Sequence, residues 1–391
     1  MGHFLSHFNM LVFPAVLLPL TARLTLDFAE VLELSFWMYL LFGITAFPWG
    51  MAGDRWGVKN LFILYYLGAG ISGFVVAWGI DDRTILPLGL AGIGLFSGIY
   101  HPIGIGWISK EFRQVSVGMG YNGMFGNLGL ATAPLIAGLV NWRWGPREVY
   151  ITLGVLNLSG LLFLLILRPS RKSRTASETS GAISGEYGTA FFILLLAMML
   201  GGIEYRGSSS IMPTYLEVKN SNLFQWVNSF FSESVSKNLV ATCITSTIFL
   251  IGMGGQFFGG HLSGRYNLKF CLLAFHAVTI PAAFLLYFVS DVSLVIVALV
   301  YFFFLLGMQP IENTLVAKYT PRKLRHSAFG FKFILTFGVG ALSIKIVGTI
   351  EKSMGILYVF PFIGGIAVAL VGVVLILIAK TWNEGSHPQK L

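Results

Sequence analysis

Ionisable side chains inside long apolar stretches are the residues of this chain best placed to do chemistry. Five charged residues lie in such stretches, and they are Glu204, Arg206, Glu312, Lys332 and Lys345. His7 and His101 lie in similar surroundings. A charged group in a hydrocarbon environment costs several kcal/mol unless it is paired or hydrated, so such groups usually bind a charged solute or carry a proton.

Catalytic signatures are missing from the sequence. It contains no nucleophile elbow, no metal-ligand spacing and no phosphate-binding loop with a lysine. We therefore expect no enzyme, no cofactor and no metal site.

The composition predicts the elements that must position these residues. Hydrophobic residues make up 55% of the 391 residues and charged residues only 11%, and the mean hydropathy is +0.76. Too little polar surface is available to cover a soluble domain, so the chain is predicted to be an all-α integral membrane protein. At about 20 residues per span, its length accommodates roughly twelve transmembrane helices.

Hydropathy places these helices in two groups of six. The predicted spans are 4–22, 33–53, 60–80, 86–109, 115–140, 148–168, 188–217, 237–263, 268–289, 292–318, 325–350 and 354–379. Residues 1–168 form the first half and residues 188–379 the second. The Ser- and Thr-rich segment 169–187 is expected to be a cytoplasmic linker, and residues 380–391 a cytoplasmic tail.

A duplicated loop motif supports this division. Gly50–Lys59 reads GMAGDRWGVK and Gly260–Lys269 reads GHLSGRYNLK, at an offset of 210 residues and without a gap. Each copy lies between two apolar runs, which indicates an internal repeat of the kind found in transporters.

The first copy resembles the loop signature of the major facilitator superfamily. The resemblance implies two six-helix halves that move around a central cavity by alternating access. It also implies a gating motif, which would comprise Gly50, Asp54, Arg55, Gly57 and Lys59, with Arg265 and Lys269 in the second copy. The second copy departs from the signature at Gly264 and Asn267. The motif is interpreted either as a latch that breaks as the halves rock or as a simple topology anchor.

Three further segments resemble the fosmidomycin-resistance group of facilitators, whose members are thought to export substrate in exchange for protons. They are GHFLSHF at the start, SGIYHPIG around His101, and the stretch from Gly126 to Gly138. The last of these also predicts a small-residue helix face with a bend at Pro134, which suits close packing near the interface of the halves. Ser6 to Asn9 departs from that group, so its drug specificity is not implied.

The basic residues predict the orientation. With the N-terminus inside, sixteen of the 26 lysines and arginines fall on the cytoplasmic side and seven on the outer side. We therefore expect an inner-membrane protein with both termini cytoplasmic, whose positive charge meets lipid headgroups rather than nucleic acid. A monomer is the expected state.

Glu312 and Lys332 are predicted to lie at the same depth in the membrane. At about 1.5 Å per residue, Glu312 lies roughly 9 Å from cytoplasmic Lys318, and Lys332 roughly 10 Å from Arg325 on the next helix. An ion pair is therefore expected. It is either a permanent structural pair or a coupled pair that a proton or the solute breaks.

Glu204 and Arg206 are two residues apart on one predicted helix, so they should point to opposite sides. When the two repeats are aligned through Pro14 and Pro213, Arg206 corresponds to His7. This correspondence indicates that Arg206 faces the cavity. Glycines in the same span could instead unwind the helix, so that both charges contribute.

The same comparison of repeats adds three residues to the cavity. His101 lies near mid-membrane and aligns with Gln309 of the second repeat, and Asn122 aligns with Lys332. His101 is either a proton carrier or a packing residue, and Asn122 either a ligand or a helix-packing amide.

These features predict a secondary active transporter for a small anionic or zwitterionic solute, exported in exchange for protons. The expected cavity residues are His7, His101, Asn122, Arg206, Gln309 and Lys332. The expected proton sites are Glu312, Glu204 or His101, with the proton gradient as the energy source. Alternatives are efflux of a lipid-like or hydrophobic drug, and a facilitator-like sensor or partner subunit that does not transport.

Overall fold

The computed structural model describes residues 1–111, 115–166, 185–320 and 325–382. This part of the chain is helical and contains no strand, as predicted. Eleven of its helices are long and apolar enough to cross a membrane, and a bent pair at the N-terminus makes a twelfth. The predicted twelve-helix fold is therefore confirmed. Most spans begin and end close to the predicted residues, but the second begins at Phe28 rather than at residue 33.

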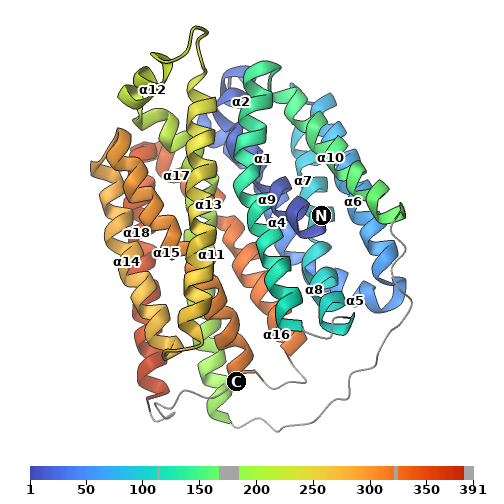
Figure 1. The fold of residues 1–391 in the computed structure, drawn as a ribbon, viewed down its shortest axis with the longest axis vertical. Helices are drawn as coiled ribbons and strands as arrows, with labels where there is room; N and C mark the ends of the chain where they lie inside the picture. The colour runs from blue at the N-terminus through green and yellow to red at the C-terminus, as the bar shows by residue number, and fades with distance from the viewer. Residues whose placement is uncertain (112–114, 167–184, 321–324, 383–391) are drawn as a thin grey trace.

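The first half contains ten helical segments that make six spans (Figure 1). They are α1 (Gly2–Ala15), α2 (Leu17–Leu24), α3 (Phe28–Glu33), α4 (Phe36–Ile44), α5 (Ala46–Trp56), α6 (Val58–Trp78), α7 (Ile85–Ser97), α8 (Tyr100–Glu111), α9 (Val115–Arg143) and α10 (Pro146–Ile166).

The second half contains six spans and a short surface helix. Its segments are α11 (Gly185–Lys219), α12 (Ser221–Asn228), α13 (Lys237–Ser263), α14 (Leu268–Phe288), α15 (Asp291–Lys318), α16 (Arg325–Phe333), η2 (Ile334–Gly338), η3 (Val339–Ala341), α17 (Leu342–Met354), η4 (Ile356–Tyr358) and α18 (Val359–Lys380). The predicted linker 169–187 lies almost wholly outside the described residues, as does most of the predicted tail.

Helix breaks fall in different places from those the sequence suggested. The first span bends by 48° between α1 and α2, just after Pro14. The glycine-rich helix α11 is continuous over 35 residues, so the regular helix predicted around Glu204 and Arg206 is confirmed and the unwound alternative is wrong. The eleventh span is also irregular, because a π-helix and a 3-10 turn follow α16. Such insertions are frequent at functional sites, and this one begins two residues after Lys332.

The most extensive contacts between the two halves involve four pairs of elements. α9 packs on α13, α1 on α11, α4 on η2, and α3 on α17. At the α4–η2 contact Gly43 lies against the backbone of Phe337 and Gly338, and a Cβ at Gly43 would overlap it. Glycine is required there because the two backbones approach so closely.

Helix α9 carries the small-residue face that the sequence predicted. It runs without a break through Pro134. Gly126 and Gly129 pack on His3 and Phe4 of α1, whereas Gly138 packs on Thr242 of α13 in the other half. The prediction of close packing at the interface is thus confirmed at Gly138.

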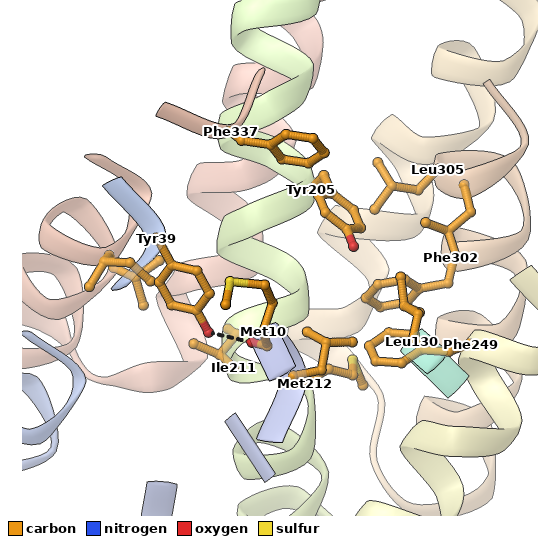
Figure 2. Packing of buried hydrophobic residues seen from close by; sticks show 14 of the residues in the cluster. Met10, Tyr39, Leu130, Tyr205, Ile211, Met212, Phe249, Phe302, Leu305 and Phe337 are labelled. Atoms are coloured by element: carbon orange, nitrogen blue, oxygen red, sulfur yellow. Dashed lines mark hydrogen bonds between the residues drawn. The ribbon is translucent and has the colours of Figure 1, made fainter. Parts of the chain in front are cut away.

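A continuous apolar core joins the halves. Figure 2 shows Met10, Tyr39 and Leu130 from the first half packed with Tyr205, Met212 and Phe302 from the second. The hydroxyl of Tyr39 donates a 3.0 Å hydrogen bond to the carbonyl oxygen of Met10. Side chains therefore fill the interface at this level.

The amphipathic helix α12 lies at one end of the molecule, at the top of Figure 1. Asp291 at the start of α15 accepts hydrogen bonds of 2.9 Å from Asn222 and from the backbone of Leu223. Beside α12 is an apolar groove of about 620 Å³, the α12 groove, lined by Leu139, Trp142, Leu223, Val227, Phe231, Val235, Leu239, Val240, Cys243, Ile244, Val292 and Val295.

Candidate functional site

The ion pair predicted between the tenth and eleventh spans is present. Nζ of Lys332 on α16 lies 3.8 Å from Oε2 of Glu312 on α15, and each residue is only 6% exposed. The ammonium group also donates to Oδ1 of Asn313. A buried pair of this kind is stable only while both partners keep their charges, because removal of either leaves an uncompensated charge.

Arg206 faces the other half, as its helical position predicted. Its guanidinium lies 4.1 Å from the ring centroid of Tyr39 on α4. The residue is 2% exposed, and Nε and Nη1 have no hydrogen-bond partner among the described residues. A buried guanidinium that stacks on an aromatic ring and keeps free donors is suited to an anionic ligand.

Glu204 points the other way, into the second half. Tyr301 on α15 donates a 3.3 Å hydrogen bond to its Oε1, and Nδ1 of His276 on α14 lies 3.8 Å from Oε2. Ser208 Oγ lies 2.7 Å from Oη of Tyr301. His276 was missing from the sequence prediction, although a histidine inside the apolar span 268–289 is itself a signal of a buried polar site.

Three histidines gather on the first half. His3 and His7 on α1 and His101 on α8 have ligating nitrogens within 4.8 Å of one another. Nδ1 of His3 lies 2.6 Å from the carbonyl oxygen of Asn122, whose side-chain oxygen accepts from the hydroxyl of Tyr100. The sequence predicted His7, His101 and Asn122 as cavity residues. It did not predict His3, which lies one helical turn before His7.

Amide side chains bridge the halves beside these groups. Asn127 on α9 donates to Gln256 on α13, and Nε2 of Gln256 donates a 2.8 Å hydrogen bond to Gln309 on α15. The predicted cavity residue Gln309 is therefore part of a hydrogen-bonded chain across the interface.

Most of the predicted cavity residues thus lie in one region between the halves. Charges from the second half act electrostatically on the histidines of the first, Arg206 on His7 and Lys332 on His101. Glu204, predicted as a proton site, differs from them because its partners Tyr301 and His276 belong to its own half. Lys345 lies apart, 52% exposed, and its Nζ is 3.3 Å from Oε1 of Glu33.

The two motif loops differ in structure. In the first, Gly57 has a φ of +76° between α5 and α6, and Arg55 and Lys59 are exposed. The side chain of Asp54 lies outside the described residues. In the second, Arg265 is exposed but Lys269 is 3% exposed, and its Nζ donates to the carbonyl and hydroxyl oxygens of Thr381 at 2.7 and 2.6 Å. These contacts of Lys269 lie within one half, and the latch role of the motif stays a prediction.

Comparison with known proteins agrees with this architecture. Residues 1–344 match the family model described as Major Facilitator Superfamily. The search of curated proteins found no match. Among solved structures, the fold is similar to a variant of the nucleoside transporter NupG, with a TM-score of 0.73, 17% identity, and coverage of 96% of this chain and 98% of that one.

Two more solved structures show the same fold. A POT family transporter in complex with 5-aminolevulinic acid has a TM-score of 0.75 at 14% identity, over 97% of this chain and 95% of that chain. A bacterial homologue of the human lysosomal transporter Spinster, inward-facing and unoccupied, has a TM-score of 0.71 at 15% identity, over 97% and 94%. At these identities the likeness concerns the fold alone.

Proposed function

We propose that this chain, which belongs to the major facilitator superfamily, exports a small anionic or zwitterionic solute in exchange for protons. Membership of this family makes it a secondary transporter that works by alternating access, rather than an enzyme. The resemblance of its first half to the fosmidomycin-resistance group supports the proposed direction.

The observation that carries the proposal is the state of Arg206. Its guanidinium is buried between the halves and stacked on Tyr39, yet two of its nitrogens have no partner among the described residues. Burial of a cation with unused donors is costly, and a solute carboxylate or phosphate would supply the missing acceptors. The fold neighbour bound to 5-aminolevulinic acid, a zwitterion, is consistent with this class of solute.

Glu312 is the proposed proton site. Protonation would neutralise the carboxyl group and release Lys332, which could then bind an anion that enters from either side. Glu204 is a second candidate, held by Tyr301 and His276. His101 is less suited to carry a proton, because its ionisable neighbours His3, His7 and Lys332 are all basic.

In this proposal the protein lies in an inner membrane with both termini in the cytoplasm, so the α12 end faces outward. It acts as a monomer among lipids and takes its energy from the proton gradient without a cofactor. The excess of lysine and arginine at the other end supports this orientation.

Transport into proteoliposomes tests the proposal. With an imposed pH gradient, the protein is expected to drive counterflow of a small carboxylate or phosphate found by a thermal-shift screen of anions and zwitterions. Arg206→Gln should raise the solute Kd at least about tenfold, because a charge-assisted bidentate contact contributes roughly 1.5–3 kcal/mol. Arg143→Gln, which changes an exposed arginine at the end of α9, is the matched control. Unchanged solute binding by Arg206→Gln would contradict the proposed role.

A second candidate function is efflux of a hydrophobic solute, which the α12 groove favours. The residues that line it are all apolar, and it reaches both α9 of the first half and α13 of the second. The same proteoliposomes discriminate between the two. Efflux of a lipophilic dye that survives Arg206→Gln, without transport of any anion, would establish this alternative.

A further inference from the structure

We propose that His3, His7 and His101 bind a divalent late transition-metal ion, with Zn²⁺ as the representative. The site lies between α1 and α8 of the first half. The inference does not rest on the transport function proposed above, although His7 and His101 are also expected cavity residues. No metal site was predicted from the sequence.

The geometry of the three rings suits a shared ion. His3 and His7 are four residues apart on α1, so their side chains lie on one face, and their Nε2 atoms are 3.1 Å apart. Two imidazoles on a tetrahedral Zn²⁺ with bonds of about 2.0–2.1 Å have their nitrogens roughly 3.3 Å apart. The ring of His101 lies 5.3 Å from that of His3 and 5.2 Å from that of His7. With all ligating nitrogens within 4.8 Å, a small rotation of the side chains would bring the third ligand to the ion.

The surroundings of His3 prepare it as a ligand. Its Nδ1 lies 2.6 Å from the carbonyl oxygen of Asn122, which can only accept, so the proton must be on Nδ1. Nε2 of His3 then carries a lone pair, which accepts a 3.1 Å hydrogen bond from Nε2 of His7. A metal ion would take the place of this shared proton, with the remaining proton of His7 on its Nδ1. A second hydrogen bond of this kind, from the far nitrogen to a backbone carbonyl, commonly fixes metal-ligating histidines. The stacked ring of Tyr100, 5.0 Å away, holds the same imidazole in place.

His101 gives an independent indication of a ligand. The residue is 4% exposed, and neither ring nitrogen has a hydrogen-bond partner among the described residues. Buried polar atoms are normally satisfied, so an imidazole with two unused nitrogens calls for an explanation. Its other ring neighbours are Phe42, Phe333, Phe337 and Tyr100, and the hydroxyl of Tyr100 already donates to Asn122. Lys332, which acts on His101 electrostatically, has no acceptor to offer. A metal ion shared with His3 and His7 would satisfy one of these nitrogens.

The ligand set selects the class of ion. Three neutral imidazoles suit Zn²⁺, Co²⁺, Ni²⁺ or Cu²⁺, whereas Mg²⁺ and Ca²⁺ prefer oxygen ligands. No carboxylate joins the cluster in the part of the chain that the structure describes. Three protein ligands leave a fourth position for water or another donor.

Direct metal binding by the full-length protein tests the proposal. Protein purified through a tag without histidines is stripped with a chelator and titrated with Co²⁺, whose visible absorption reports coordination, and Zn²⁺ is then added in competition. One equivalent of Co²⁺ should bind with a Kd in the micromolar range or tighter, and Zn²⁺ should displace it. His3→Ala and His7→Ala should each weaken binding at least tenfold. His261→Ala, which removes an exposed histidine at the end of α13, should bind like the wild type.

Thermal stability provides a second readout, since an ion that binds only the folded state raises Tm. Zn²⁺ should raise the Tm of the wild type and of His261→Ala but not of His7→Ala. His101→Gln should likewise show no rise in Tm with Zn²⁺. If that variant does not fold, the His3→Ala and His7→Ala variants alone decide the test. Absence of stoichiometric Co²⁺ binding by the wild type would overturn the proposal. Wild-type affinity in His3→Ala and His7→Ala would do the same.

Discussion

The two halves of the molecule bury their polar groups in different ways. In the first half, Asn9, Ser97 and Asn157 form a neutral knot in which the amide groups of Asn9 and Asn157 hydrogen-bond each other at 2.9 and 3.1 Å. The second half instead buries charges, above all Glu312 and Lys332. The neutral knot has no group that gains or loses a proton near neutral pH, so it keeps its shape. The charged pair can change its protonation state. We therefore infer that the first half acts as a scaffold half, which keeps its shape, and the second as a responsive half, which responds to protons.

The histidine cluster modifies this contrast. His3, His7 and His101 give the first half ionisable groups of its own, but they are basic and surrounded by aromatic rings and amides. They differ from the second half, whose charged Arg206 and Lys332 act on them electrostatically. The duplication thus left similar scaffolds with different chemistry on each side.

Breaking the charged pair should have the largest effect. Glu312→Ala is expected to lower the free energy of unfolding by about 3–5 kcal/mol, because Lys332 stays buried without its counter-charge. The double variant with Lys332→Ala should recover most of this loss in thermal or denaturant unfolding. Glu233→Ala, in an exposed loop, is the control.

Proton-driven counterflow by the same variants decides what the pair does. If Glu312 is the proton site, Glu312→Gln and the double variant should both lose coupling. Recovery of coupled transport in the double variant would instead identify the pair as structural.

Breaking the neutral knot should cost less. Asn157→Leu removes the partner of Asn9 and is expected to destabilise the protein by about 1–2 kcal/mol, in the range of hydrogen bonds between membrane helices. The pH dependence of transport should keep its wild-type shape. Asn60→Leu, at an exposed position on α6, should change stability by less than about 0.5 kcal/mol. A shifted pH profile in Asn157→Leu would remove the distinction between a scaffold half and a responsive half.

An exposed ion pair should have the smallest effect. Arg23, in the last turn of α2, has its Nε 2.5 Å from Oδ1 of Asp81, which lies in the loop after α6. This hydrogen bond holds the pKa of Asp81 below its ordinary value of 3.8. A lowered pKa stabilises the fold above 3.8, and this contribution is lost as the pH falls through the lowered value. The Tm difference between wild type and Asp81→Asn should therefore be small at pH 7, as for surface pairs of about 0.2–1 kcal/mol, and vanish in acid. A difference that grows on acidification would contradict this account.

Local features of the sequence predicted much of the site. The Glu312–Lys332 pair followed from equal depth on adjacent antiparallel helices, and the opposite directions of Glu204 and Arg206 followed from helical periodicity. Both inferences concern one helix or one hairpin. They needed no knowledge of how the halves pack.

Contacts between distant segments were not predictable in this way. Tyr39 on α4 meets Arg206 on α11 only because both helices pack against η2 and η3 at the interface. His276 on α14 lies near Glu204 on α11 because both helices pack against α15 in the second half. Lys269 was predicted as part of a mobile motif, yet the end of α18 lies close enough for Thr381 to bind it.

The sequence by itself determined the class of protein, the number of helices, the repeat and the depth of each charged residue. These follow from hydropathy, periodicity and the rise per residue, which act along the chain. Only the tertiary structure decided which side chains share a site: a continuous α11, an irregular eleventh span after Lys332, and three histidines from two helices in one cluster. The physical reason is that such contacts depend on how helices cross, which small differences in packing across the interface determine.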